Sequence, residues 1–148
     1  MYKLARNKIT VERGSGDAFN FAANLENFAL WFPGVESIIS ANSLPFTEKG
    51  KKYKETFASL GSKKKVVVEV KDCQVEKYIV TESEFMPVLP RMEISFHALP
   101  DDRTEIVWSM VSRNSSFLWA ILVPLVKLIM HNRSKKGLVR LRKILEKP

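Results

Sequence analysis

One acidic side chain in this sequence is placed where it could transfer protons. In the stretch KKYKETFAS, Tyr53, Glu55 and Phe57 alternate with polar residues. Residues two apart in a strand share one face of a sheet, so Glu55 would point into the same apolar space as its aromatic neighbours. Burial raises the pKa of a carboxyl group, which can then act as a general acid or base near neutral pH. Glu55 and Tyr53 are therefore the candidate proton-transfer residues.

A second interpretation of Glu55 involves no catalysis. A β-bulge or an edge-strand position would leave its carboxylate near solvent or paired with a Lys or Arg side chain. Glutamate is rarely buried without a partner, so we favour this second interpretation.

The remaining reactive residue types form no recognisable catalytic pattern. His97 has the strand parity of Glu93 and Ser95, so we expect it to face water. His131 lies in a polar run and is expected to be solvated as well. One cysteine, Cys73, and two histidines are too few for a structural zinc site, and no Ser-His-Asp, Cys-His or glycine-rich phosphate-loop spacing is present. We predict no metal and no cofactor.

Alternating and helical patterns predict the elements that position these residues. Ile9 and Val11 indicate a short first strand, and two short helices are expected over residues 15–23 and 26–32. Pro33 and Gly34 end the second helix. Further strands are expected at residues 35–41, 51–59, 64–71, 75–85, 92–99 and 104–112. No helix separates these strands, so the sheet should be antiparallel, while the mixed pattern of residues 75–85 leaves that strand's register open.

The C-terminal segment is expected to form one long helix that Pro124 bends or divides near Ala120 and Ile121. Lys127 and the polar run that starts at His131 leave too few apolar residues for a membrane span. A stripe at helical spacing should face the sheet: Trp119, Val123, Val126, Met130, Ser134, Gly137, Leu141 and Leu145. Because two members of this stripe are small, space between the helix and the sheet is expected.

The order of these elements resembles the START-like helix-grip superfamily, also labelled SRPBCC or polyketide cyclase/dehydrase-like. Three stretches carry the resemblance: GDAFNFAANLENFALWFPGVESI with its Trp-x-Pro-Gly-Val ending, the late strand DRTEIVWSM, and LVPLVKLIMHNRSKKGLVRLRKIL. The resemblance implies an α+β fold in which residues 1–148 form one domain, with a curved antiparallel sheet of about seven strands around the C-terminal helix. It also implies an apolar pocket for lipids, sterols, quinones, polyketides or plant hormones. It places no catalytic residue on a matching position of this sequence.

The lining of such a pocket follows from the predicted faces of the strands and the helix. The candidate ligand-binding residues are Trp31, Phe32, Tyr53, Phe57, Val66, Val68, Phe96, Trp108, Met110 and Met130. The same side chains would equally form an ordinary packed core. We predict that the protein binds or transports a hydrophobic small molecule, lipid-like, isoprenoid or polyketide, without catalysis. The alternative is a cyclase- or dehydrase-like enzyme that uses Glu55 or Tyr53.

Charge and exposed apolar residues suggest further partners. The net charge of +8 favours anionic surfaces, but the basic stretches match no nucleic-acid-reading motif, so nucleic acid is not an expected partner. Six apolar residues fall outside the sheet-facing stripe: Phe117, Leu118, Ile121, Leu125, Leu128 and Ile129. They need cover from the short helices, a second subunit or an anionic membrane surface, which leaves both monomer and homodimer open.

The lone Cys73 and an N-terminal stretch without a signal-type apolar region predict a cytoplasmic protein, with the membrane surface as a peripheral site.

Overall fold

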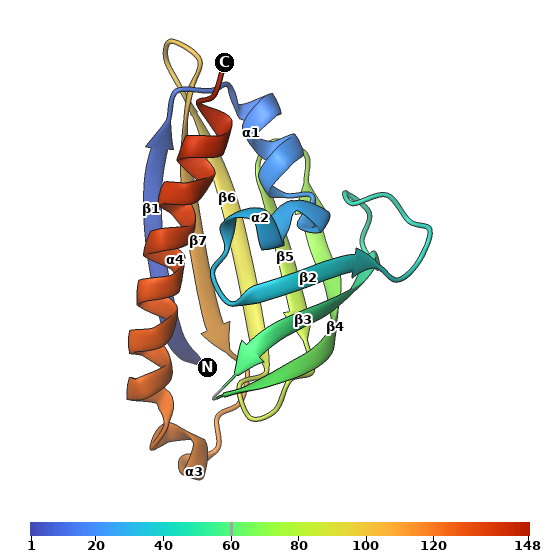
Figure 1. Cartoon of the computed structure of the whole chain (residues 1–148), viewed down its shortest axis with the longest axis vertical. Coiled ribbons are helices and arrows are strands. Elements are labelled where there is room, and N and C mark those ends of the chain that lie inside the picture. Colours follow the sequence, from blue (N-terminus) through green and yellow to red (C-terminus); the bar gives the residue numbers. More distant parts are fainter. Residues whose placement is uncertain (60) are drawn as a thin grey trace.

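A computed structural model describes residues 1–59 and 61–148, and its main element is one antiparallel sheet that curves toward a long helix (Figure 1). The strands follow the spatial order β1-β7-β6-β5-β4-β3-β2. Their bounds are β1 Tyr2–Val11, β2 Val35–Ser40, β3 Lys52–Ser59, β4 Ser62–Gln74, β5 Tyr78–Ser83, β6 Pro90–Leu99 and β7 Arg103–Ser112. The predicted α+β architecture with seven antiparallel strands is confirmed.

Short helices follow β1, as expected, and a long helix ends the described chain. The helical elements are α1 Ser15–Ala22, the 3-10 helix η1 Leu25–Asn27, α2 Phe28–Trp31, α3 Phe117–Ala120 and α4 Val123–Leu145. Gly34 follows α2 with a φ of 89°, a conformation that glycine adopts without strain. The chain can therefore turn sharply from α2 into β2.

The predicted division of the C-terminal helix is confirmed. Helix α3 ends at Ala120, and Pro124 lies in the first turn of α4. Backbone N–H groups in a first turn have no partner within the helix, so the missing N–H of proline costs nothing there.

Helix α4 packs along β1 and against α2 through the predicted stripe. Most stripe residues are buried, whereas Val126 and Met130 are half-buried. The Asn7 side-chain amide on β1 donates a 2.7 Å hydrogen bond to Ser134 Oγ. A Cβ atom added to Gly137 would lie 3.2 Å from the Trp31 carbonyl oxygen, so glycine allows α4 to approach α2 closely.

The register of β5, which the sequence left open, depends on a β-bulge in β4. Val68 pairs with Ser83 and Val70 with Thr81, and the register shifts between Val70 and Asp72. The extra residue lies in β4, so Val70 and Cys73, which are three residues apart, pair with Thr81 and Ile79 on one face of β5, where Ser83 is buried as well.

Helix α3 is fixed to β7 and to the loop between β5 and β6 by side-chain hydrogen bonds. Ser112 Oγ accepts a 2.9 Å bond from Trp119 Nε1 and donates a 2.5 Å bond to the Val88 carbonyl. The Asn114 amide donates to the Pro87 carbonyl at 2.8 Å. These three contacts hold α3 at one end of the sheet, where Figure 1 shows it.

Candidate ligand-binding cavity

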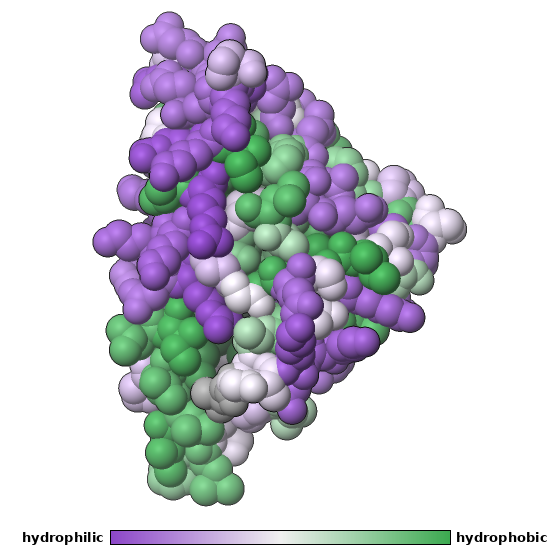
Figure 2. Space-filling model, in the orientation of Figure 1, coloured by the Kyte–Doolittle hydropathy of each residue, from purple (hydrophilic) through white to green (hydrophobic). Residues whose placement is uncertain are grey.

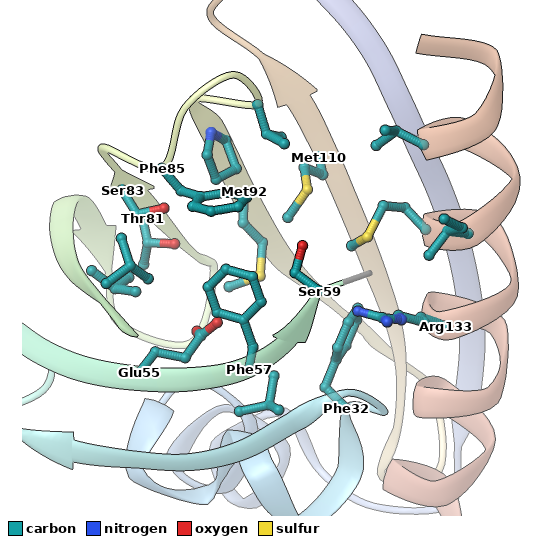
Figure 3. A pocket seen from close by; sticks show the side chains of 18 of the residues that line it. Phe32, Glu55, Phe57, Ser59, Thr81, Ser83, Phe85, Met92, Met110 and Arg133 are labelled. Carbon is teal, nitrogen blue, oxygen red and sulfur yellow. The ribbon is translucent and has the colours of Figure 1, made fainter. Parts of the chain in front are cut away.

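A cavity of about 280 Å³ lies between the curved sheet, α2 and α4. Its volume is close to the lower limit of roughly 300 Å³ for small-molecule sites. Apolar side chains from all sides make up most of its wall: Phe32, Val35, Phe57, Val66, Val68, Phe85, Val88, Met92, Trp108, Met110, Leu122, Leu125, Val126, Ile129 and Met130. Figure 3 shows Phe57, Met92 and Met110 directed into this space.

Most of the candidate ligand-binding residues line this cavity. They are Phe32, Phe57, Val66, Val68, Trp108, Met110 and Met130. Contact with a ligand remains a prediction for each of them.

The other three candidates lie in the packed core instead of the cavity wall. Trp31 is fully buried, with its ring centroid 5.0 Å from that of Phe28. Phe96 packs edge-on against Phe19 of α1, with their ring centroids 5.3 Å apart. Tyr53 is fully buried, and burial raises the pKa of its hydroxyl to about 12. A hydroxyl with that pKa keeps its proton at neutral pH, which makes Tyr53 a poor proton donor.

Glu55 lies in the cavity wall, so the favoured solvent-facing interpretation was wrong. The residue pairs with Ile38 on one side and Val66 on the other, because β2 covers the outer edge of β3. The register irregularity in this region falls on β2, between Val35 and Ser37, and leaves β3 regular. Within the described residues, no hydrogen bond or ion pair reaches the Glu55 carboxylate, which points into the cavity (Figure 3).

The apolar surroundings of Glu55 change its ionisation. Desolvation raises the pKa of the Glu55 carboxyl from 4.5 to about 7. At neutral pH this group is therefore shared between the acid, which can donate a hydrogen bond, and the carboxylate, which can accept a proton.

Arg133 also lines the cavity, although it belongs to the polar run that starts at His131, which was expected to be solvated. Its guanidinium lies over Gly34, where an added Cβ atom would come within 2.6 Å of Arg133 Nη1. Figure 3 shows the side chain reaching from α4 toward Phe32. In the described chain no carboxylate lies within 4.0 Å of its charged nitrogens. The signal was available, because Arg133 follows Met130 of the sheet-facing stripe by three residues, nearly one helical turn.

The remaining polar groups of the wall are neutral or already paired. Thr81 and Ser83 are buried, and Glu82 is paired with Arg91 at 2.6 Å and with Arg113 at 3.6 Å. No three His, Cys, Asp or Glu side chains of the described chain are grouped as a metal site. His97 and His131 are exposed, as expected. The charged groups with no ionic partner in the wall are thus Glu55 and Arg133, within residues 1–59 and 61–148.

Comparisons with known proteins find the same architecture without close sequence similarity. No protein-family model and no curated protein matches the sequence. A solved structure from Thermus thermophilus superposes with a TM-score of 0.74 at 15% identity, covering 94% of each chain. A START superfamily protein from Mycobacterium smegmatis gives a TM-score of 0.73 at 12% identity and 97% coverage of each chain. The chain has the START-like helix-grip fold.

A further solved structure with the same fold comes from a biosynthetic pathway. The di-domain ARO/CYC BexL from the BE-7585A biosynthetic pathway matches with a TM-score of 0.69 and 14% identity over 97% of this chain and 50% of its own. Identities this low show a shared helix-grip fold and do not carry a shared reaction.

Proposed function

We propose that residues 1–148 form one domain that binds or carries a hydrophobic small molecule between the sheet and α4. The observation that carries this proposal is the cavity itself, whose wall is mostly apolar and comes from sheet, loop and helix alike. Transfer of an apolar ligand from water into such a wall is favourable by roughly 25 cal/mol per Å² of buried surface. Lipid-like, isoprenoid and polyketide molecules meet this requirement.

The two charged groups of the wall support an orientation for that ligand. Arg133 would bind an anionic or carbonyl group at one end of the ligand, near α2 and α4. Glu55 would repel an anion, while its protonated form would donate a hydrogen bond to a neutral oxygen. The proposed ligand is therefore an amphiphile with its polar end at Arg133.

Blocking the cavity should remove the ligand. Met110 lies on β7 in the cavity wall, and a Met110→Trp side chain would occupy space that the ligand needs. Native mass spectrometry of gently purified wild-type protein should show an adduct of about a few hundred daltons, the mass that a small-molecule site holds. The tryptophan variant should lack this adduct.

Met110→Leu is the matched control, because it conserves volume and apolar character. It should retain the adduct. An adduct on the tryptophan variant at the wild-type level would place the ligand outside this cavity and contradict the proposal.

A second candidate function is a cyclase- or dehydrase-like reaction, favoured by Glu55 in the apolar wall and by the fold that BexL shares. The protonated carboxyl would donate its proton to a ligand oxygen, and the carboxylate would remove one from carbon. With a polyketide substrate, Glu55→Gln should lower turnover by roughly 10² to 10⁴-fold, the usual contribution of a general acid or base. Full turnover in this variant would remove Glu55 as the proton-transfer residue, whereas no turnover in the wild type would eliminate the enzyme candidate and leave ligand binding untouched.

A further inference from the structure

An exposed apolar surface lies at the end of the molecule where α3 meets α4. We call it the apolar corner, and it consists of Phe117, Leu118, Ile121, Leu122, Leu125 and Leu128. Each of these side chains is between 49% and 83% exposed. Figure 2 shows hydrophobic side chains gathered over α3 and the first part of α4, with hydrophilic residues along the rest of the helix. Exposed apolar residues that gather in one patch indicate a binding surface.

The chain around the apolar corner carries charge of one sign only. From Arg113 to Leu145 the sequence contains eight Lys or Arg residues and no Asp or Glu. Lys127 lies between Leu125 and Leu128 in the sequence and is exposed, and Lys135 and Lys136 are exposed further along α4. A solvated helix usually carries both signs of charge, which support each other at i,i+4 spacing. This helix instead complements an anionic partner.

Charge distinguishes the three kinds of cover that the sequence allowed. The short helices α1 and α2 leave the corner exposed. A second copy of the chain would bring two basic α4 segments together with no acidic residue between Arg113 and Leu145 to offset them. An anionic bilayer supplies both an apolar layer and phosphate groups.

We propose that the apolar corner docks on an anionic phospholipid membrane. The side chains of α3 and the first turns of α4 enter the head-group layer, and the basic residues of α4 contact lipid phosphates. The described chain has no helix with the length and hydrophobicity needed to cross a bilayer. The contact is therefore with one leaflet, in the manner of an interfacial amphipathic helix.

Docking would also bring the cavity to the lipid. Leu122 and Leu125 belong both to the apolar corner and to the cavity wall, next to Ile129. A hydrophobic ligand could then move between the bilayer and the cavity without crossing water. This route rests on the proposed function, whereas docking itself does not depend on a bound ligand.

Vesicle co-sedimentation tests the proposal with the full chain. Wild-type protein should bind vesicles of phosphatidylcholine mixed with phosphatidylglycerol, bind phosphatidylcholine vesicles much more weakly, and lose affinity as salt increases. The double variant Phe117→Ser/Leu118→Ser should weaken binding on the order of a hundredfold, since each exposed apolar side chain contributes roughly tenfold. Lys127→Gln should weaken binding roughly fivefold, on the anionic vesicles alone.

Val75→Ser is the matched control, because Val75 is an exposed apolar residue in the turn after β4, outside the apolar corner. It should bind vesicles like wild type, and all variants should unfold at wild-type temperatures. Equal wild-type binding to neutral and anionic vesicles, or wild-type affinity in the double variant, would overturn the proposal. So would a wild-type dimer that the double variant converts to monomer without any vesicle binding.

The two proposals can fail separately. Vesicle binding without a ligand adduct would retain docking and reject the carrier function. A ligand adduct on protein that does not bind anionic vesicles would retain the carrier function and reject docking.

Discussion

At pH 8, Glu55→Gln is expected to stabilise the folded protein by on the order of 3 kcal/mol. The wild-type carboxyl has a pKa of about 7 when folded and 4.5 as its ordinary value. A difference of this size corresponds to on the order of 3 kcal/mol, at 1.36 kcal/mol per pKa unit. Glutamine has no charge to desolvate, so the variant avoids this cost.

The stability difference between wild type and Glu55→Gln should change with pH. The folded protein binds the Glu55 proton more tightly than the unfolded chain does, so this group contributes its full stability below about pH 4.5. That contribution is lost as pH rises toward about 7. Urea unfolding over a pH series should therefore show wild type and variant equally stable near pH 4, with the variant increasingly more stable up to pH 8.

Glu48→Gln provides the control, because Glu48 is exposed in the loop between β2 and β3. Its stability difference from wild type should stay small and change little with pH. A Glu55→Gln variant less stable than wild type at pH 8 would mean that the carboxylate has a favourable partner and is not desolvated.

Gly137→Leu is expected to destabilise the protein by about 2 kcal/mol, which is the upper overpacking cost of about 3 kcal/mol less a gain of roughly 1 kcal/mol in helix propensity. The new Cβ would lie 3.2 Å from the Trp31 carbonyl oxygen and 3.3 Å from Phe32 and Pro33, and the rest of the leucine side chain has no space. Overpacking of a filled interface costs about 1 to 3 kcal/mol or more, which exceeds the gain of roughly 1 kcal/mol in helix propensity.

The midpoint of urea unfolding measures this loss. Lys136→Leu is the control, because it adds the same side chain at the exposed position immediately before Gly137. The free energy of unfolding of this variant should stay within about 0.5 kcal/mol of wild type. Equal stability of Gly137→Leu and wild type would show that α4 can move away from α2 at little cost.

The architecture could be predicted because it depends on local patterns. Alternation of apolar and polar residues indicated the strands, and the absence of intervening helices indicated antiparallel pairing. Pro124 marked the division between α3 and α4 because proline removes a hydrogen bond from the interior of a helix but is tolerated in its first turn.

The boundary between cavity and core could not be predicted from the same patterns. Strand parity shows which face a residue occupies, but not whether an opposing side chain fills the space in front of it. Trp31 and Phe96 face inward like Phe57, yet aromatic partners from α1 and α2 pack against them. Phe19 and Phe96 are distant in sequence and meet only in the folded chain, whereas Phe28 lies one helical turn from Trp31 within α2.

The two charged cavity residues show why residue type misled the prediction. Glutamate and arginine are usually exposed, so Glu55 and Arg133 were assigned to solvent. Both have the spacing of their apolar neighbours, two residues from Phe57 in a strand and three from Met130 in a helix. Spacing was the better guide at both positions.

The hydrogen bonds of Ser112 have a mechanical consequence. The same hydroxyl joins the Trp119 indole of α3 to the carbonyl of Val88, and Val88 is part of the cavity wall. A force that displaces α3 must therefore pull on that wall or break one of these bonds. Movement of α3 is thus coupled through the Ser112 hydroxyl to the cavity wall at the β5–β6 loop.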